Sequence, residues 1–199
     1  MAVFYNNYIK LPLKRAREFL FAPKYDINEG INVLGAKCLT VEEFQEEAYT
    51  RPFLSFRTNF RASKSHRTTD TGFGCMIRSG SMLVAEALQR SMFGTHFKLD
   101  PEFSKKCPRQ IWMASLFNEE MKSDTRHFHP FSIQHLMELG ELKFGKREGE
   151  WFAPGTIAQV YQHVISNYCE EQLNMSIYLC RPGFNTIYEV YIFFSLIII

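Results

Sequence analysis

Apolar side chains recur along the chain at spacings that predict mostly helices. Between positions 76 and 92 they fall close to one face of a helix, so we expect a helix that packs one side against a core. The intervening polar positions fall mostly on other faces: Arg78, Ser81, Gln89 and Arg90. Shorter patterns predict helices over 108–121, over 132–139 and from Pro154 to about residue 168.

Turn and capping residues mark the boundaries of two elements in the first third of the chain. Residues 31–38 have the composition of a strand that bends at Gly35. Thr40 is placed to cap a short helix, and Glu43, three positions later, completes a capping box. Pro52 then ends that helix.

Similar signals occur in the second half of the chain. Ser132 is placed to cap the helix over 132–139, and Gly140 to end it in the left-handed conformation. Residues 175–180 are β-branched enough for a strand, and residues 11–21 are compatible with a basic helix. Because helices come first and strands at the end, we expect an α+β fold whose sheet is mostly missing from the chain.

Composition and charge narrow the class of protein. With 199 residues, 46% of them hydrophobic, the chain can bury a substantial core. Acidic and basic side chains are interspersed and the formal net charge is only +2, so we expect no nucleic-acid partner. The five cysteines form no CxxC pair, and the first ten residues lack the apolar core of a secretory signal. We therefore expect a reducing, cytoplasmic setting.

The last nine residues, "YIFFSLIII", form an apolar tail over 191–199. A membrane-spanning helix needs about 20 apolar residues, so this tail is too short to span a bilayer. We interpret it as a buried strand that is cut off before its turn. The alternative is a tail translated past the true coding boundary.

One cysteine, Cys75, stands where a glycine-containing turn meets the long helix predicted from position 76. The start of a helix favours a thiolate, which is the nucleophilic form of cysteine. Gly72 and Gly74 allow a sharp turn and a close substrate approach, and the Cys75 N–H would point at a developing oxyanion. The alternative is that Cys75 is a small apolar residue buried at a helix start.

A second stretch, "GKREGEWFAPGTIAQV" over 145–160, predicts a loop followed by a helix with proline in its first turn. Trp151 and Phe152 are either core anchors or a lid over a cleft. Elsewhere, His127 and His129 form a pair, but no second group of Cys or His lies at a spacing that completes a zinc site. We expect no metal and no cofactor.

Read together, these stretches resemble the autophagins, the papain-like cysteine peptidases of autophagy. The resemblance runs from about residue 31 to 190. It rests on these segments: "LGAK" (34–37), "FRTNF" (56–60), "TDTGFGCMIRSGSMLVAEAL" (69–88), "FSIQHLMELGELKFGKREGEWFAPGTIAQV" (131–160) and, more loosely, "NTIYEVY" (185–191). It implies an α+β papain-like fold with the helical half present and much of the C-terminal sheet missing. The expected organisation is an N-terminal extension over 1–30, an incomplete peptidase domain over 31–190 and the atypical tail over 191–199.

The resemblance also implies a function. Such enzymes cut a ubiquitin-like autophagy modifier after a glycine near its C-terminus and later release it from phosphatidylethanolamine. Cys75 matches their nucleophile, and Trp151 matches a tryptophan over the active-site cleft. Gly74, Phe56 and Asp70 are implied at further substrate-binding positions. Of these, Asp70 matches the turn residue, which shapes the loop before Cys75 and is not expected to take part in the chemistry. The implied partner is the modifier, as precursor and as lipid conjugate, with membrane contact only through the lipidated form and a monomeric enzyme.

The chain departs from the family pattern at three places. Phe56 replaces a tyrosine that would help the oxyanion, and Phe73 replaces a tryptophan in the turn. The family's catalytic acid and base lie in an Asp-Pro-His segment, and no Asp-x-His occurs in these 199 residues. The alternative to a peptidase is therefore a truncated, inactive module that only binds the modifier.

Overall fold

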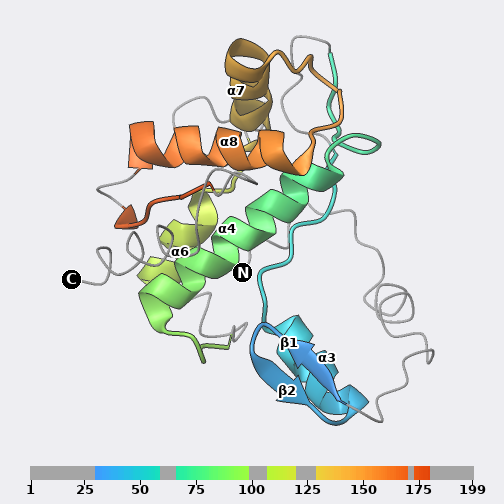
Figure 1. Ribbon diagram of the computed structural model, residues 1–199, viewed down its shortest axis with the longest axis vertical. Helices are drawn as coiled ribbons and strands as arrows, with labels where there is room; N and C mark the ends of the chain where they lie inside the picture. Colours follow the sequence, from blue (N-terminus) through green and yellow to red (C-terminus); the bar gives the residue numbers. More distant parts are fainter. Residues whose placement is uncertain (1–29, 59–65, 99–106, 120–128, 170–172, 180–199) are drawn as a thin grey trace.

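The computed structural model describes residues 30–58, 66–98, 107–119, 129–169 and 173–179. Along the chain the elements are β1 (Ile31–Val33), β2 (Ala36–Cys38), α3 (Val41–Tyr49), α4 (Cys75–Phe93), α6 (Pro108–Ser115), α7 (Ile133–Phe144), α8 (Pro154–Val164) and the π-helical turn η1 (Ile165–Cys169). In the described residues the molecule is rich in helix and has one small sheet (Figure 1).

The first elements form a unit at the far end of α4 from Cys75 (Figure 1). Strands β1 and β2 pair antiparallel, and α3 packs against both. The expected single strand that bends at Gly35 is therefore wrong: Leu34 and Gly35 both have positive φ, so the chain reverses there into a hairpin. The capping box is confirmed, because the Thr40 Oγ1 accepts from the Glu43 N–H and the Glu43 carboxylate accepts from the Thr40 N–H.

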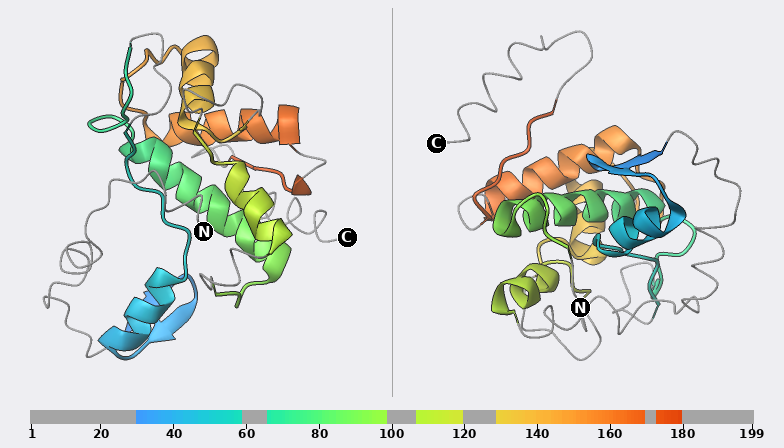
Figure 2. Two further views of the ribbon diagram at one scale, coloured as in Figure 1. Left: turned by 180° about the vertical axis from the view of Figure 1, so that it is seen from behind. Right: turned by 90° about the horizontal axis from the view of Figure 1, so that it is seen from below.

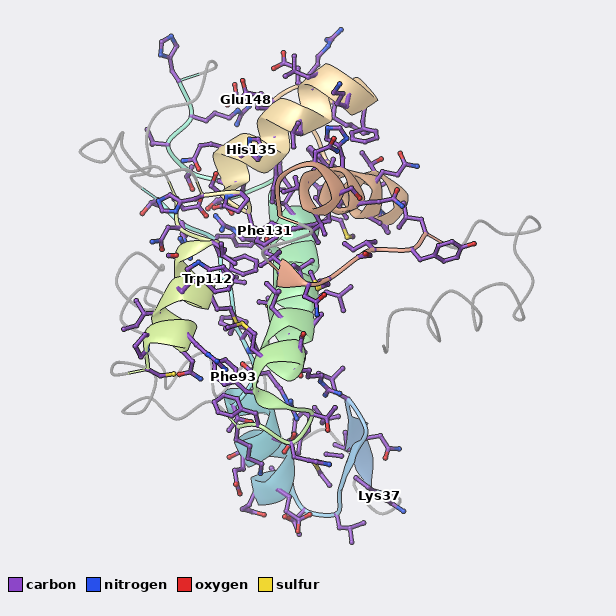
Figure 3. The ribbon with its side chains drawn as sticks, turned by 90° about the vertical axis from the view of Figure 1, so that its left-hand side faces the viewer. Lys37, Phe93, Trp112, Phe131, His135 and Glu148 are labelled. Atoms are coloured by element: carbon purple, nitrogen blue, oxygen red, sulfur yellow. The ribbon has the colours of Figure 1, made fainter. Side chains whose placement is uncertain are left out.

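Helix α4 runs through the centre of the molecule (Figures 1 and 2). Helix α8 crosses it, α7 packs on α8, and α6 lies along the half of α4 nearer its C-terminus. Gly80 permits the close approach of α4 to α8, since a Cβ there would lie 2.9 Å from the Tyr161 ring. Phe131, labelled in Figure 3, packs in the same core with ring centroids 4.9 Å from Phe117 and 5.7 Å from Tyr161.

The predicted long helix over 76–92 is confirmed as α4, but its buried face differs from the sequence pattern. Three of the polar residues assigned to other faces, Arg78, Ser81 and Gln89, are buried, whereas Leu83 is 70% exposed. Polar side chains can be buried in this way where they find hydrogen-bond partners, and an apolar pattern does not reveal such partners. The pattern of apolar residues thus located the helix but did not identify the polar side chains that it buries.

Helix α7 begins as predicted, with the Ser132 hydroxyl accepting from the His135 N–H. The predicted stop at Gly140 is wrong, because α7 continues to Phe144 and ends at Gly145, which has φ 65°. Gly140 instead contacts the ring of Phe152, where an added Cβ would lie 2.3 Å from a ring carbon. This glycine provides space for packing rather than a turn.

Other boundaries also differ from the sequence expectations. Helix α6 ends at Ser115 and not near 121, and α8 passes into η1 at Ile165. Residues 175–179 form no strand, and the described sheet lies near the start of the chain, not at its end. The predictions for 1–29, His127, Cys180 and the tail over 191–199 lie outside the described residues. Within the described part, each helix is too short or too polar to cross a membrane.

Candidate active site

Cys75 is the first residue of α4, and its side chain is partly exposed. Gly74 takes the N-cap position and makes no side-chain cap. The first N–H groups of a helix have no partner within the helix, and they form its electropositive end. Cys75 therefore stands at the head of a helix, as the sequence predicted, and it is not enclosed in the core.

Asp70 holds the turn that leads into Cys75. Its backbone carbonyl accepts from the N–H groups of Phe73 at 3.3 Å and of Gly74 at 2.9 Å. Gly72 has φ 97°, which favours glycine at the centre of this turn. At Gly74 the limit is space, since a Cβ would lie 2.7 Å from the Cβ of Asp70. Both glycines are thus required by the geometry, for different reasons.

The Asp70 side chain is completely buried and bonded through both carboxylate oxygens. Its Oδ1 accepts from the backbone N–H of Arg57 at 2.7 Å, and its Oδ2 accepts from the Nε of Arg78 at 2.5 Å. The sequence assigned Asp70 to shaping the turn. Its contacts fit that assignment, because both carboxylate oxygens are bonded within the protein and the side chain is enclosed.

Arg78 lies one helical turn after Cys75 and contacts Glu119 in addition to Asp70. Its Nη1 donates to Oε1 of Glu119 at 2.5 Å, and Glu119 also lies 3.5 Å from Nη1 of Arg57. Burial by itself would lower the pKa of Arg78, but the carboxylates of Glu119 and Asp70 outweigh it and raise that pKa above its ordinary value. Arg78 therefore stays charged behind the cysteine turn.

Trp151 joins the second predicted stretch to the cysteine turn. Its indole N–H donates to the carbonyl of Gly72 at 2.7 Å, while 68% of the residue remains exposed. Phe152, the next residue, is buried. The alternatives for this pair are thus resolved: Phe152 is the core anchor, and Trp151 lies at the surface beside the turn before Cys75.

The segment that contains Phe56 lies beside the turn before Cys75, because the two residues that follow Phe56 contact that turn. The Arg57 N–H bonds to Asp70, and Thr58 forms an antiparallel bridge with Thr69. Phe73 is buried within the turn, with the guanidinium of Arg67 5.6 Å from its ring centroid. The structure therefore assembles the segments that contain Phe56, Asp70, Gly74, Cys75 and Trp151.

Sequence reasoning did not identify Arg57, Arg78 and Glu119 as part of this site. The available signal was a charged residue, Arg78, in the first turn of a helix expected to pack on a core. For metals the expectation of no site stays a prediction; the described residues contain no cluster of three or more His, Cys, Asp or Glu able to hold an ion. His129 is buried, while His66 and His96 are exposed.

The family model described as "Peptidase C54 catalytic domain" matches residues 41–195. Three relatives are similar over about two thirds of the chain. A "Probable cysteine protease ATG4" of Coccidioides immitis is 33% identical over 131 residues, which are 65% of this chain and 28% of the relative. "Cysteine protease ATG4D" of Xenopus laevis is 27% identical over a stretch that covers 71% of this chain and 37% of the relative. "Cysteine protease ATG4B" of the same species is 32% identical over 66% of this chain and 33% of the relative. The chain therefore spans well under half the length of these relatives.

Proposed function

Because the chain belongs to the peptidase C54 family, whose catalytic-domain model matches residues 41–195, we propose that it is a cysteine peptidase of autophagy with a papain-like fold and Cys75 as its nucleophile. The observation that carries the proposal is the position of Cys75, partly exposed at the head of α4. The names of the relatives, all cysteine proteases, support the same reaction class. They do not favour the alternative of a module that only binds.

The proposed substrate is a ubiquitin-like autophagy modifier, cut after its C-terminal glycine. The Cys75 sulfur attacks the glycine carbonyl, a thioester forms, and the C–N bond to the following residue or to the lipid headgroup amine breaks. The amine leaves with a proton, and water then hydrolyses the thioester to release the glycine carboxylate and the thiol. The reaction removes the modifier from its precursor peptide or from phosphatidylethanolamine.

One residue beside the turn supports a glycine-specific substrate. Trp151 presents a flat aromatic ring beside Gly72, and such a ring leaves room for a chain end without side chains. The missing Cβ of Gly74 faces the buried Asp70 and serves the turn instead. The Cys75 N–H is the proposed oxyanion donor, because Phe56 has no hydroxyl to supply one. The setting proposed for this reaction is the cytoplasm, which the five unpatterned cysteines support.

Labelling with an activated form of the modifier tests the proposal. The modifier carries an electrophile in place of its C-terminal glycine, and mass spectrometry locates the adduct on the chain. We expect the adduct at Cys75 and its loss in Cys75→Ala. Cys107→Ala is the matched control, because Cys107 is also a partly exposed free cysteine and its removal should leave capture intact. Equal labelling of both thiols, or capture that persists in Cys75→Ala, would refute the assignment.

Turnover of the 199-residue chain is predicted to be slow even where capture succeeds. General acid–base catalysis contributes about 10²- to 10⁴-fold, and the chain contains no Asp-x-His segment to provide it. Cleavage of a modifier precursor, followed by gel densitometry, should therefore lag behind capture. Rapid multiple turnover by this chain would show that one of its own histidines serves as the base.

A further inference from the structure

A set of buried charges lies behind the cysteine turn and is not explained by the proposed chemistry. Asp70, Arg78, Glu119 and Arg57 are each 4% exposed or less. Two carry positive and two negative charge, so the group is neutral as a whole. We call these four residues the Arg78 network. Buried ion pairs are weak stabilisers compared with apolar packing, so a role beyond stability deserves a test.

Arg78 connects two separate parts of the chain. Its Nε bonds to Asp70, which holds the turn before Cys75, and its Nη1 bonds to Glu119, which follows α6. Both distances are 2.5 Å. Arginine can hold two carboxylates at once because its donors lie in a rigid planar fork, whereas lysine offers a single charged point.

Glu119 also contacts the first residue of α7, so it connects Arg78 to that helix. Its Oε2 accepts from the backbone N–H of Ile133, the first residue of that helix, at 2.9 Å. After α7 the chain turns at Gly145 and reaches Trp151, whose indole bonds back to Gly72 in the cysteine turn. The cysteine turn and the segment over 133–151 are therefore linked at both ends, once through Arg78 and Glu119 and once through Trp151.

We propose that Arg78 is a positioning residue that holds the cysteine turn and the segment of α7 and Trp151 in one fixed relation. Without the two-way link, the turn keeps its local hydrogen bonds and the longer contact of Arg57 with Glu119 at 3.5 Å, but it loses its shortest attachment to the start of α7. Trp151 then no longer stays over the carbonyl of Gly72. The significance for catalysis rests on the proposed function, whereas the positioning itself does not.

Hydrogen exchange in the full chain tests the positioning directly. Arg78→Lys keeps the charge and the neutrality of the network but removes the fork. We expect amide exchange to accelerate about tenfold in peptides covering 70–78 and 131–152, a local opening distinct from global unfolding. Unchanged exchange in either segment, or equal acceleration in every described element, would overturn the proposal.

Arg90→Lys is the matched control on the same helix. Arg90 also makes a two-way link, from Nε to Glu86 at 2.7 Å and from Nη2 to the Leu34 carbonyl at 3.0 Å, but near the other end of α4. Its replacement should accelerate exchange over 31–38 and leave 131–152 unchanged. Acceleration over 131–152 in this control would also overturn the proposal, because the effect would not depend on Arg78.

A second variant covers the case in which Arg78→Lys does not fold. Glu119→Gln keeps an acceptor for the Ile133 N–H and removes the negative charge that faces Arg78 and Arg57. The same local pattern of exchange is expected, and its absence counts against the proposal. Capture of Cys75 by the activated modifier should fall about tenfold in either variant and stay unchanged in Arg90→Lys, since small misplacements of reacting groups cost up to about a hundredfold. If wild-type capture fails, the proposed function is refuted while the exchange result still decides the positioning.

Discussion

The contact between Gly74 and Asp70 shows how a single missing side chain determines the site. A Cβ at position 74 would meet the Asp70 Cβ at 2.7 Å and its backbone carbonyl oxygen at 2.9 Å. These atoms cannot move away easily, because the Asp70 carboxylate is bonded on both sides. The turn thus depends on glycine for space, in addition to any preference in backbone angles.

Gly74→Ala should therefore destabilise the protein by about 1–3 kcal/mol, the usual cost of overpacking a tight site, and should reduce capture at Cys75. Urea unfolding followed by circular dichroism measures the first effect. Gly155→Ala is the control, because nothing lies within 4 Å of a Cβ there and the residue is in the first turn of α8. Equal stability of the two variants would contradict this account of the turn.

Helix α7 illustrates how packing between elements overrides a helix-stop signal. Gly140 lies inside the helix, and the Phe152 ring fills the space where its side chain would be. Alanine is favoured over glycine in a helix by about 1 kcal/mol, but forcing a methyl group into this contact costs about 1–3 kcal/mol. The packing cost exceeds the propensity gain.

We expect Gly140→Ala to lower the free energy of unfolding, and Gly140→Ala with Phe152→Leu to recover part of the loss because a smaller side chain faces the new methyl group. The urea unfolding midpoints of both variants, of Phe152→Leu alone and of the wild type form a double-mutant cycle that measures the coupling between the two positions. A stabilised Gly140→Ala protein would mean that propensity and not the Phe152 contact controls this position.

Across the whole molecule, Tyr161 connects the two helices that build the core. It lies in α8, is buried, and its hydroxyl is 2.5 Å from the Ser81 Oγ of α4. Burial raises the pKa of Tyr161, and the hydrogen bond with Ser81 lowers it by less, so the folded-state pKa lies above the unfolded value of about 10. The folded protein therefore keeps this proton at a pH where the unfolded chain loses it.

The stability contributed by Tyr161 is fully present below about pH 10 and is lost as pH rises through the folded-state pKa. Between pH 10 and 11 the wild type should lose up to about 1.4 kcal/mol more than Tyr161→Phe, since phenylalanine has no proton to lose. Urea unfolding of both proteins at pH 8, 10 and 11 provides the comparison. A difference between them that does not change with pH would refute the prediction.

Short-range signals in the sequence were sufficient to locate the capped helix α3 and the cysteine at the start of α4. Both depend on residues within a few positions of one another, such as Thr40 with Glu43 and Gly74 with Cys75. Hydrogen-bonding groups and turn residues act at that range, so their spacing carries the information. The segment over 69–88, on which much of the resemblance to the peptidase family rests, contains this glycine and this cysteine.

Contacts between distant segments could not be inferred in the same way. Arg78 and Glu119 are 41 positions apart, and Trp151 and Gly72 are 79 apart. Whether Arg78 is buried, whether Gly140 ends a helix and whether Trp151 or Phe152 enters the core all depend on which helices meet. That choice is made by the packing of α4, α7 and α8 together, because a side chain's environment is determined by its neighbours in space and not by its neighbours in the chain.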